Sequence, residues 1–205
     1  MIHRLFAAWH SRADRHVIVD GQRLFVPRGV MDPVAFRTGA WFAPWAARQV
    51  CPGQQILDLC AGSGVVGLLC ARAGARVTAL DRDPRSIAAC RANGLEDARI
   101  GDLFAPVAGQ RFDHIFANPP YFNRDPHAGP LDHALYGGAG YALIARLAAA
   151  APAHLRPGGA ADVVLSERAR GSAAALGPGW RPIAWDRVDG ELLAVWRLTA
   201  DHRGP

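Results

Sequence analysis

The amino-acid sequence predicts an α/β fold: a doubly wound, mainly parallel sheet of seven strands, preceded by a short amino-terminal extension. From residue 55 onward, short apolar runs alternate with alanine-rich stretches of helical periodicity, a pattern typical of βαβ units. One of these apolar runs leads directly into a glycine-rich turn. Near its end the chain has two strand-like segments around an Asp-Gly pair, which is typical of a tight antiparallel hairpin.

The bulk composition supports one folded domain. A chain of 205 residues with 50% hydrophobic content is long enough for one core, and a charged content of 20% excludes a disordered chain. The formal charge of +5 comes wholly from arginine, because the sequence contains no lysine. This charge favours an anionic partner such as RNA; the plainer interpretation is a solvated surface on which arginine has replaced lysine.

The sequence predicts neither a metal site nor a membrane segment. Its four cysteines lack a CxxC pair and nearby histidines at ligand spacing, which argues against zinc and suits a reducing compartment. The amino-terminal run MIHRLFAAWHSRADRH has too many charges for a secretory signal or a membrane span. We therefore expect a cytoplasmic protein, with a short amphipathic helix starting within residues 5–9.

Residues 1–50 are expected to form an extension that covers the cofactor or the substrate. Residues 17–26 alternate about a central Asp-Gly pair, which predicts a β-hairpin that acts as a lid or an edge outside the core. Residues 33–50 carry aromatic side chains at partly helical spacing. Residues 51–205 are then expected to form the cofactor-binding domain.

The main domain is expected to alternate strands with helices. The apolar runs predict seven strands, at residues 55–60, 76–81, 98–101, 112–117, 160–166, 182–186 and 191–198. The alanine-rich stretches predict helices at residues 64–74, 84–93 and 139–155. The last two strands are joined by Asp189-Gly190 and should close the sheet as an antiparallel hairpin, and residues 201–205 are expected to fray.

A buried strand followed at once by a glycine-rich turn and a helix indicates a site for an adenosine cofactor. In the run DLCAGSGVVG, Gly62 and Gly64 would let the backbone approach a ligand where a Cβ atom would collide. Asp81 ends the next predicted strand, where a carboxylate can accept hydrogen bonds from ribose hydroxyls. Asp83 lies two residues further on, beside a proline, and is expected to cap the following helix.

Asp58 helps to decide which of two kinds of adenosine cofactor the site would bind. A dinucleotide such as NAD brings a diphosphate to the helix amino terminus, where the Asp58 carboxylate would repel it. The same carboxylate suits the methionine ammonium group of S-adenosylmethionine, so we favour a methyl donor. Asp102, after the third strand, can accept from the adenine amino group, with Leu103 beside the ring; otherwise Asp102 is a turn residue.

The run Asn118-Pro119-Pro120-Tyr121 follows the fourth predicted strand, at the sheet edge where open α/β sheets bind ligands. The side-chain oxygen of Asn118 and the carbonyl of Pro119 can both accept from an NH2 group. Amide and arylamine nitrogens are poor nucleophiles because their lone pair is delocalised, so positioning should dominate catalysis. Tyr121 offers an aromatic face on which a planar acceptor could stack.

No general base is evident in the sequence. His127 and His133, in the loop after the proline run, are the candidates. The plainer interpretation is that both are loop residues in contact with solvent or substrate.

Four segments carry a family resemblance: DLCAGSGVVG, ALDRDP, FANPPY and ALYGGAGYALIARLAAAAPAHLRPGG. Over about residues 25–170 the chain resembles class I S-adenosylmethionine-dependent methyltransferases of the NPPY group, within it the HemK-type glutamine methyltransferases and the small-domain RNA methyltransferases. The resemblance implies a Rossmann-like fold. It places the cofactor against Thr38, Asp58, Gly62, Gly64, Asp81, Arg82, Asp102, Leu103 and Asn118, and the acceptor against Asn118, Pro119, Pro120, Tyr121 and Phe122.

The favoured function is N-methylation of a planar nitrogen, with a glutamine side-chain amide of a translation protein as the first choice. An exocyclic amino group of an rRNA or tRNA base is the second choice, and a small-molecule amine or amide is the third. A non-catalytic cofactor-binding scaffold is the alternative from another class. Full-length release-factor methyltransferases carry a helical substrate-recognition domain that the residues before the resemblance do not supply, which leaves the acceptor open.

Overall fold

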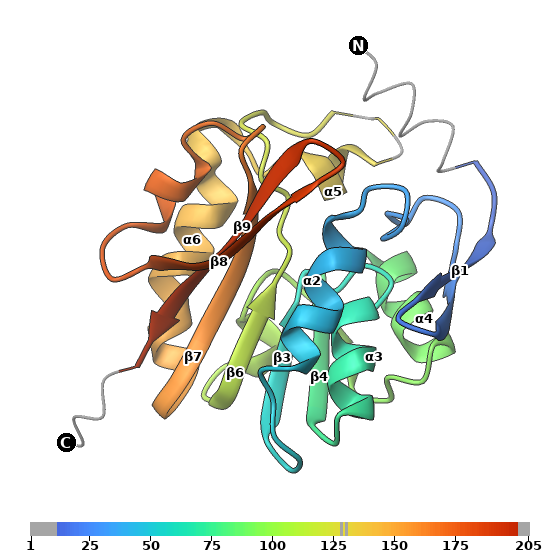
Figure 1. Cartoon of the computed structure of the whole chain (residues 1–205), viewed down its shortest axis with the longest axis horizontal. Coiled ribbons are helices and arrows are strands. Elements are labelled where there is room, and N and C mark those ends of the chain that lie inside the picture. Colours follow the sequence, from blue (N-terminus) through green and yellow to red (C-terminus); the bar gives the residue numbers. More distant parts are fainter. Residues whose placement is uncertain (1–11, 128, 130, 201–205) are drawn as a thin grey trace.

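A sheet with helices on both faces organises residues 12–127, 129 and 131–200, which are the residues described by the computed structural model (Figure 1). The strands of this sheet are β3 (Gln55–Leu59), β4 (Arg76–Asp81), β5 (Ala98–Ile100), β6 (Phe112–Ala117), β7 (Leu155–Ser166), β8 (Arg181–Val188) and β9 (Glu191–Thr199). The α-helices are α2 (Thr38–Ala47), α3 (Val65–Arg72), α4 (Pro84–Ala92), α5 (Asp132–Leu135) and α6 (Ala142–Ala150). Four 3-10 turns complete the list: η1 (Ala105–Val107), η2 (Ala139–Tyr141), η3 (Ala151–His154) and η4 (Ser172–Leu176).

The strand order is β5-β4-β3-β6-β7-β9-β8, and the first five strands in this order are parallel. β9 runs antiparallel to β7 and β8, so the predicted seven-stranded sheet with its carboxyl-terminal hairpin is confirmed. β3 lies between β4 and β6, so the chain order reverses at β3. Open α/β sheets bind ligands at the carboxyl ends of the strands at such a reversal. The expected helix within residues 5–9 and the expected fraying of residues 201–205 lie outside the described residues.

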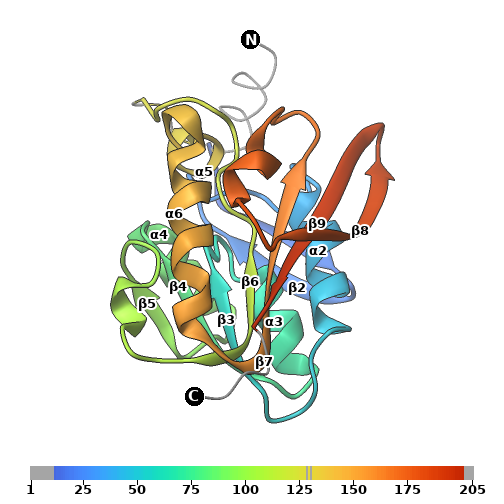
Figure 2. The ribbon, with the colours of Figure 1, turned by 90° about the vertical axis from the view of Figure 1, so that its left-hand side faces the viewer.

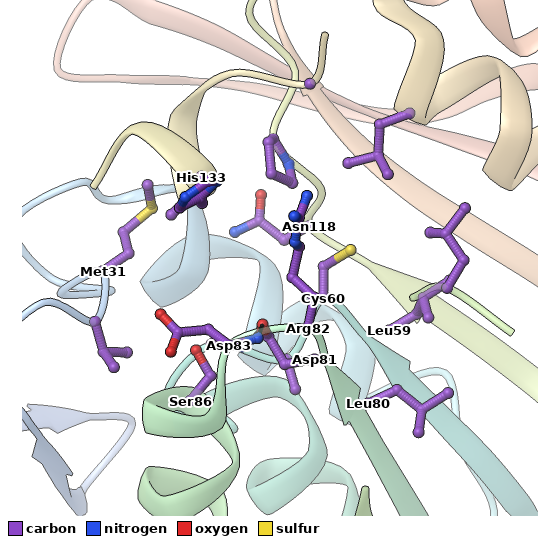
Figure 3. A pocket seen from close by; sticks show the side chains of 18 of the residues that line it. Met31, Leu59, Cys60, Leu80, Asp81, Arg82, Asp83, Ser86, Asn118 and His133 are labelled. Atoms are coloured by element: carbon purple, nitrogen blue, oxygen red, sulfur yellow. Dashed lines mark hydrogen bonds between the residues drawn. The ribbon is translucent and has the colours of Figure 1, made fainter. Parts of the chain in front are cut away.

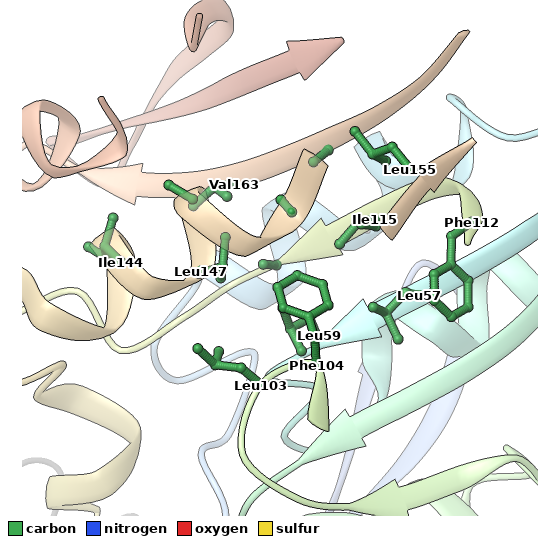
Figure 4. Packing of buried hydrophobic residues seen from close by; sticks show 14 of the residues in the cluster. Leu57, Leu59, Leu103, Phe104, Phe112, Ile115, Ile144, Leu147, Leu155 and Val163 are labelled. Carbon is green, nitrogen blue, oxygen red and sulfur yellow. The ribbon is translucent and has the colours of Figure 1, made fainter. Parts of the chain in front are cut away.

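Neighbouring residues of the central strands β3 and β6 pack into two cores, one on each face of the sheet. On one face Ile56 and Phe116 pack with α2 and α3. On the other face Leu57 and Ile115 pack with Ile144 of α6 (Figures 2 and 4). Each of these side chains is almost fully buried, and burial of one large apolar side chain stabilises a fold by about 1.5–3 kcal/mol. The central strands are therefore held from both sides, which fixes the positions of the residues that follow them.

The predicted helix at residues 139–155 is shorter in the structure, because its predicted range contains two interruptions. Gly140 and Tyr141 have φ values of 65° and 59°, which separate η2 from α6. Pro152 lies in the 3-10 turn that follows α6. The strand predicted at 160–166 begins earlier, because Leu155 already pairs with Phe112 before an irregularity in the ladder.

The hairpin predicted at residues 17–26 is present as β1 (Arg15–Val19) and β2 (Gln22–Val26), but its placement outside the core was wrong. Val19 and Leu24 are buried in the same core as α2 and α3. The side chain of Asn93, just after α4, hydrogen-bonds both backbone groups of Phe25 and the carbonyl oxygen of Ser63. The hairpin is thus attached to the glycine-rich loop, and it fixes the start of the segment that leads to α2.

Candidate active site

A cavity of about 290 Å³ opens at the carboxyl ends of β3 and β4 (Figure 3). Its walls come from the glycine-rich loop, the loop after β5, the segment before α2 and the segment that contains α5. Seven of the nine residues predicted to contact the cofactor line this cavity. These are Asp58, Gly62, Asp81, Arg82, Asp102, Leu103 and Asn118.

Asp58 is a buried carboxylate with one backbone partner. It sits on β3 with 2% of its surface exposed, and its Oδ2 accepts a hydrogen bond of 2.8 Å from the backbone N–H of Gly67 in α3. Burial raises the pKa of Asp58 to about 7, although the bond from Gly67 opposes the shift. A buried carboxylate is stabilised by a cation placed beside it. The cavity therefore favours a ligand with a positive group at Asp58.

Asp81, at the end of β4, is oriented by the backbone on both sides. Its Oδ2 accepts from the N–H of Gly62 and its Oδ1 from the N–H of Asp83, each at 2.9 Å. Burial raises the pKa of Asp81, and these backbone bonds act against the rise. A carboxylate has about four acceptor positions, so Asp81 can also accept a hydrogen bond from a ligand hydroxyl. Asp83 caps α4 by accepting from the N–H of Arg85, as the sequence predicted.

The two predicted glycines have different roles. Gly62 has a φ of 56°, and a Cβ atom there would meet nothing within 4 Å, so the loop is open on its cavity side. Gly64 has a φ of 79° and does not line the cavity; a Cβ atom there would lie 2.8 Å from Leu95 and 3.0 Å from the sulfur of Cys90. Gly64 is therefore required for packing of α3 against the α4 region, which differs from the predicted approach to a ligand.

The far end of the first cavity carries Asp102 and Leu103. Leu103 is buried and has a φ of 47°. The Asp102 side chain is about half exposed and forms an ion pair with Arg146 of α6. Asp102 can still face a ligand, because both of these charged residues line the cavity.

A second cavity, of about 760 Å³, adjoins the first at Asn118. Asn118 directly follows β6 and lines both cavities. Pro119, Tyr121 and Phe122 line only the second cavity. Pro120 lines the first cavity instead.

Thr38, predicted to contact the cofactor, lies beside the proline run. It lines the second cavity alone, and its Oγ1 is 3.2 Å from the hydroxyl oxygen of Tyr121. Burial raises the pKa of Tyr121 to about 12. The ring of Tyr121 packs edge-on against Phe122, with ring centroids 5.2 Å apart. The aromatic wall predicted for Tyr121 is therefore present, and Thr38 contacts it.

The two histidines considered as bases lie outside the second cavity. His127 is exposed and lines neither cavity, whereas His133 lines the first cavity, opposite Asp83 and Ser86 in Figure 3. In the part of the chain that the structure describes, no group of three or more His, Cys, Asp or Glu side chains is placed to hold a metal ion. Among the same residues, no helix is long and apolar enough to cross a membrane.

Several walls of these cavities had no predicted role. Phe36 and Tyr136 line both cavities, and Arg146 lines the first. Phe36 lies two residues before the predicted Thr38, so a search for apolar residues near that position could have found it. Arg146 carries no local signal, because its partner Asp102 lies on a distant loop.

The fold and the first cavity define a class of protein: a Rossmann-like α/β protein with a cavity at the carboxyl ends of its central strands. A family model described as the methyltransferase small domain matches residues 46–177, and this chain belongs to that family. The predicted class, S-adenosylmethionine-dependent methyltransferases with a Rossmann-like sheet, is thereby confirmed for family and fold. Curated relatives that are 32–39% identical are named glutamine methyltransferases of release factors or of ribosomal protein uL3.

Three individual proteins illustrate this similarity. The release factor glutamine methyltransferase of Xylella fastidiosa (strain Temecula1) is 39% identical over 122 residues, 52% of this chain and 44% of that protein. The tRNA1(Val) (adenine(37)-N6)-methyltransferase of Shewanella amazonensis is 42% identical over 82 residues, 35% of each chain. The 16S rRNA N2 G1207 methyltransferase of T. thermophilus, solved with AdoMet and guanosine, has a TM-score of 0.62 at 22% identity and covers 91% of this chain and 50% of that one, a likeness of fold alone. The chain spans about half the length of the curated glutamine methyltransferases it matches.

Proposed function

We propose that this chain is an S-adenosylmethionine-dependent N-methyltransferase whose acceptor is the side-chain amide of a glutamine in a translation protein. The observation that carries the proposal is the position of Asn118, which lines both cavities. A residue in this position can hold an acceptor nitrogen in the second cavity while the methyl donor occupies the first. Residues 29–39, which line both cavities, would cover the two ligands, and the reaction would take place in the cytoplasm.

The first cavity fits S-adenosylmethionine through its own charges. The buried carboxylate of Asp58 would hold the methionine ammonium group, and Asp81 would accept from the ribose hydroxyls. The open side of Gly62 leaves room for the ligand beside the loop. Asp102 and Leu103 would lie at the adenine. When bound, the cofactor supplies a methyl group made electrophilic by its sulfonium centre.

The acceptor chemistry follows from what Asn118 and Pro119 can accept. The amide oxygen of Asn118 and the backbone carbonyl of Pro119 would each accept one hydrogen of the acceptor NH2 group. Two such bonds orient the nitrogen and leave one face open for attack on the methyl group, so positioning lowers the barrier. A protonated N-methyl amide is a strong acid, and its proton leaves to water after transfer. This accounts for a second cavity that neither His127 nor His133 lines.

Two observations support an amide as the first choice of acceptor. Three relatives that match over 155, 168 and 182 residues are named glutamine methyltransferases. The second cavity is walled by aromatic rings, Tyr121, Phe122 and Tyr136 among them, which suit a planar uncharged group. Two acids of this cavity form ion pairs within it: Asp189 with Arg37, and Glu191 with Arg168.

An exocyclic amino group of an RNA base is the second candidate. Two relatives are named tRNA adenine methyltransferases, and a planar base would stack on the same rings. The net charge of +5 and the arginines around the second cavity favour a phosphate backbone nearby.

Methyl transfer from radiolabelled S-adenosylmethionine to purified release factor, to ribosomal protein and to total tRNA and rRNA tests the proposal. We expect label in protein, with mass spectrometry placing one methyl group on a glutamine. Label in RNA alone would select the second candidate, and its salt dependence would be steep because phosphate contacts release counterions. Tight binding of S-adenosylhomocysteine without transfer to any macromolecule would leave a small-molecule acceptor or a scaffold.

A further inference from the structure

The start of α2 separates the two cavities. Pro33 and Gly39 line the first cavity, Arg37 and Thr38 line the second, and Phe36 lines both. A Cβ atom on Gly39 would lie 2.8 Å from the Cβ of Pro33, so the helix start is packed tightly against the preceding turn. This partition therefore has little freedom to move, and a side chain anchored to it has a fixed position.

A chain of two hydroxyl groups links this partition to the proline run. The Oγ1 of Thr38 lies 3.3 Å from the carbonyl oxygen of Phe36 and 3.2 Å from the hydroxyl of Tyr121. Each hydroxyl has one hydrogen to donate, and a carbonyl can only accept. Both bonds form together when Thr38 donates to Phe36 and accepts from Tyr121. Among the described residues, the Tyr121 hydroxyl forms its hydrogen bond with Thr38 alone.

The ring of Tyr121 needs such an anchor because its other contacts are apolar. It packs edge-on against Phe122 and lies against the core beneath α6. Ring packing resists displacement but leaves the tilt of the ring loosely defined, whereas a hydrogen bond to the phenol fixes its far end. A tilted ring would alter the shape of the second cavity beside Asn118, where the acceptor nitrogen must be aligned.

We propose that Thr38 is a positioning residue for the acceptor, which holds the Tyr121 ring in place as a wall of the second cavity. This inference rests on the proposed function, because it takes the second cavity as the acceptor site. It also reassigns Thr38 from the cofactor to the acceptor. Thr38 does not line the first cavity, so loss of its hydroxyl should leave cofactor binding unchanged.

The test compares Thr38→Val, which keeps the shape of the side chain and removes the hydroxyl, with Thr38→Ser, which keeps the hydroxyl. We expect Thr38→Val to lower kcat/KM for the acceptor about five- to tenfold, the effect of losing one neutral hydrogen bond. Thr38→Ser should stay within about twofold of the wild type. The affinity for S-adenosylhomocysteine, measured by calorimetry, should stay within about twofold in both variants.

A second pair of variants shows whether the effect passes through the tyrosine. Tyr121→Phe should lower kcat/KM by a similar factor, and adding Thr38→Val to it should cause no further loss. The proposal is overturned if the two losses multiply, or if Thr38→Ser is as impaired as Thr38→Val. It is also overturned if Thr38→Val weakens S-adenosylhomocysteine binding in proportion to its activity, which would return Thr38 to the cofactor.

The acceptor in these assays is whichever fraction the wild type methylates in the screen described above. Failure of the glutamine proposal would therefore change the acceptor but leave the comparison of variants intact. Thermal unfolding of the wild type, Thr38→Val, Tyr121→Phe and the double variant gives a readout without any acceptor. Thr38→Val and Tyr121→Phe should each lower Tm by a few degrees, and the double variant should lower it by no more than the larger single change. Additive shifts in Tm would contradict the hydroxyl pair.

Discussion

The two cavities meet at Asn118 but are built in different ways. In the first, the important carboxylates are held by backbone N–H groups: Gly67 donates to Asp58, and Gly62 donates to Asp81. These residues belong to one continuous strand-loop-helix-strand unit. Their geometry is therefore set by local structure, and it would form in any chain that folds this unit.

The second cavity is assembled from segments far apart in the sequence, and side chains join them. Arg37, before α2, forms an ion pair with Asp189 at the turn of the β8–β9 hairpin. Arg168, after β7, forms an ion pair with Glu191 of β9. Exposed ion pairs contribute only about 0–1 kcal/mol each, so these walls can change at little cost to the fold. Under the proposed function, cofactor binding therefore depends on backbone groups, whereas acceptor choice depends on a few side chains.

The largest expected effect lies at the junction of the two cavities. Asn118→Ala should lower methyl transfer about 10²- to 10³-fold, because it removes one of the two groups that orient the acceptor nitrogen. The affinity for S-adenosylhomocysteine should stay within about threefold, since Asp58 and Asp81 are unchanged. Asn123→Ala is the control: Asn123 also lines the second cavity, but its side-chain oxygen is used by the N–H of Gly140. Equal losses in the two variants would mean that Asn118 has no special position.

The next effect tests the cofactor cavity alone. Asp58→Asn should weaken S-adenosylhomocysteine binding about 30- to 100-fold, because a charged hydrogen bond to the ligand ammonium is worth about 2–3 kcal/mol. The comparison ligand is 5′-methylthioadenosine, which lacks the amino-acid part. Its affinity should be the same for the variant and the wild type. A similar loss for both ligands in calorimetry would show that the substitution damages the cavity and that Asp58 does not contact the ammonium.

A smaller effect follows from the pKa of Asp58. With a pKa of about 7 in the free protein, the ionised fraction rises about tenfold between pH 6 and pH 8, and affinity for S-adenosylhomocysteine should rise with it. Asp58→Asn should flatten this dependence. The folded-state pKa lies above the ordinary value of 3.8, so stability of the ligand-free protein falls as pH rises from about 4 to 7. The Tm of the Asn variant, relative to that of the wild type, should therefore rise between pH 4 and pH 8.

The last prediction concerns stability and distinguishes the two glycines of the loop. Gly64→Ala should lower the free energy of unfolding by about 2–4 kcal/mol, because an added Cβ meets Leu95 and Cys90 at a positive φ. Gly62→Ala meets no atom within 4 Å and should cost only the backbone strain, about 1 kcal/mol. Urea denaturation of both variants measures the difference. Equal destabilisation would contradict the separate roles of the two glycines.

The contrast between the cavities also explains what could be predicted from the sequence. The strand before the loop, the acid at the end of β4 and the cap at Asp83 were predictable, because each depends on neighbours along the chain. That Thr38 lines only the second cavity was not predictable, because the direction of its side chain depends on the distant Tyr121. The ion pair between Asp102 and Arg146 joins a loop to α6 and leaves no local signal.

The fold shows the same limit. The turns at Asp20-Gly21 and at Asp189-Gly190 were predictable, because both residues of each pair have positive φ values that favour this dipeptide. The burial of the first hairpin was not, because it depends on contacts with the core around α3 and with Asn93.

We infer that the buried Asp58 makes the first cavity a site for a cationic methyl donor and not for a dinucleotide. Calorimetric titration of the wild-type protein with S-adenosylhomocysteine, and separately with NAD, tests this inference. We expect binding of one S-adenosylhomocysteine per chain, tighter at pH 8 than at pH 6, and no binding of NAD. Binding of NAD, or failure of S-adenosylhomocysteine to bind, would contradict the assignment of Asp58 and of the cavity built around it.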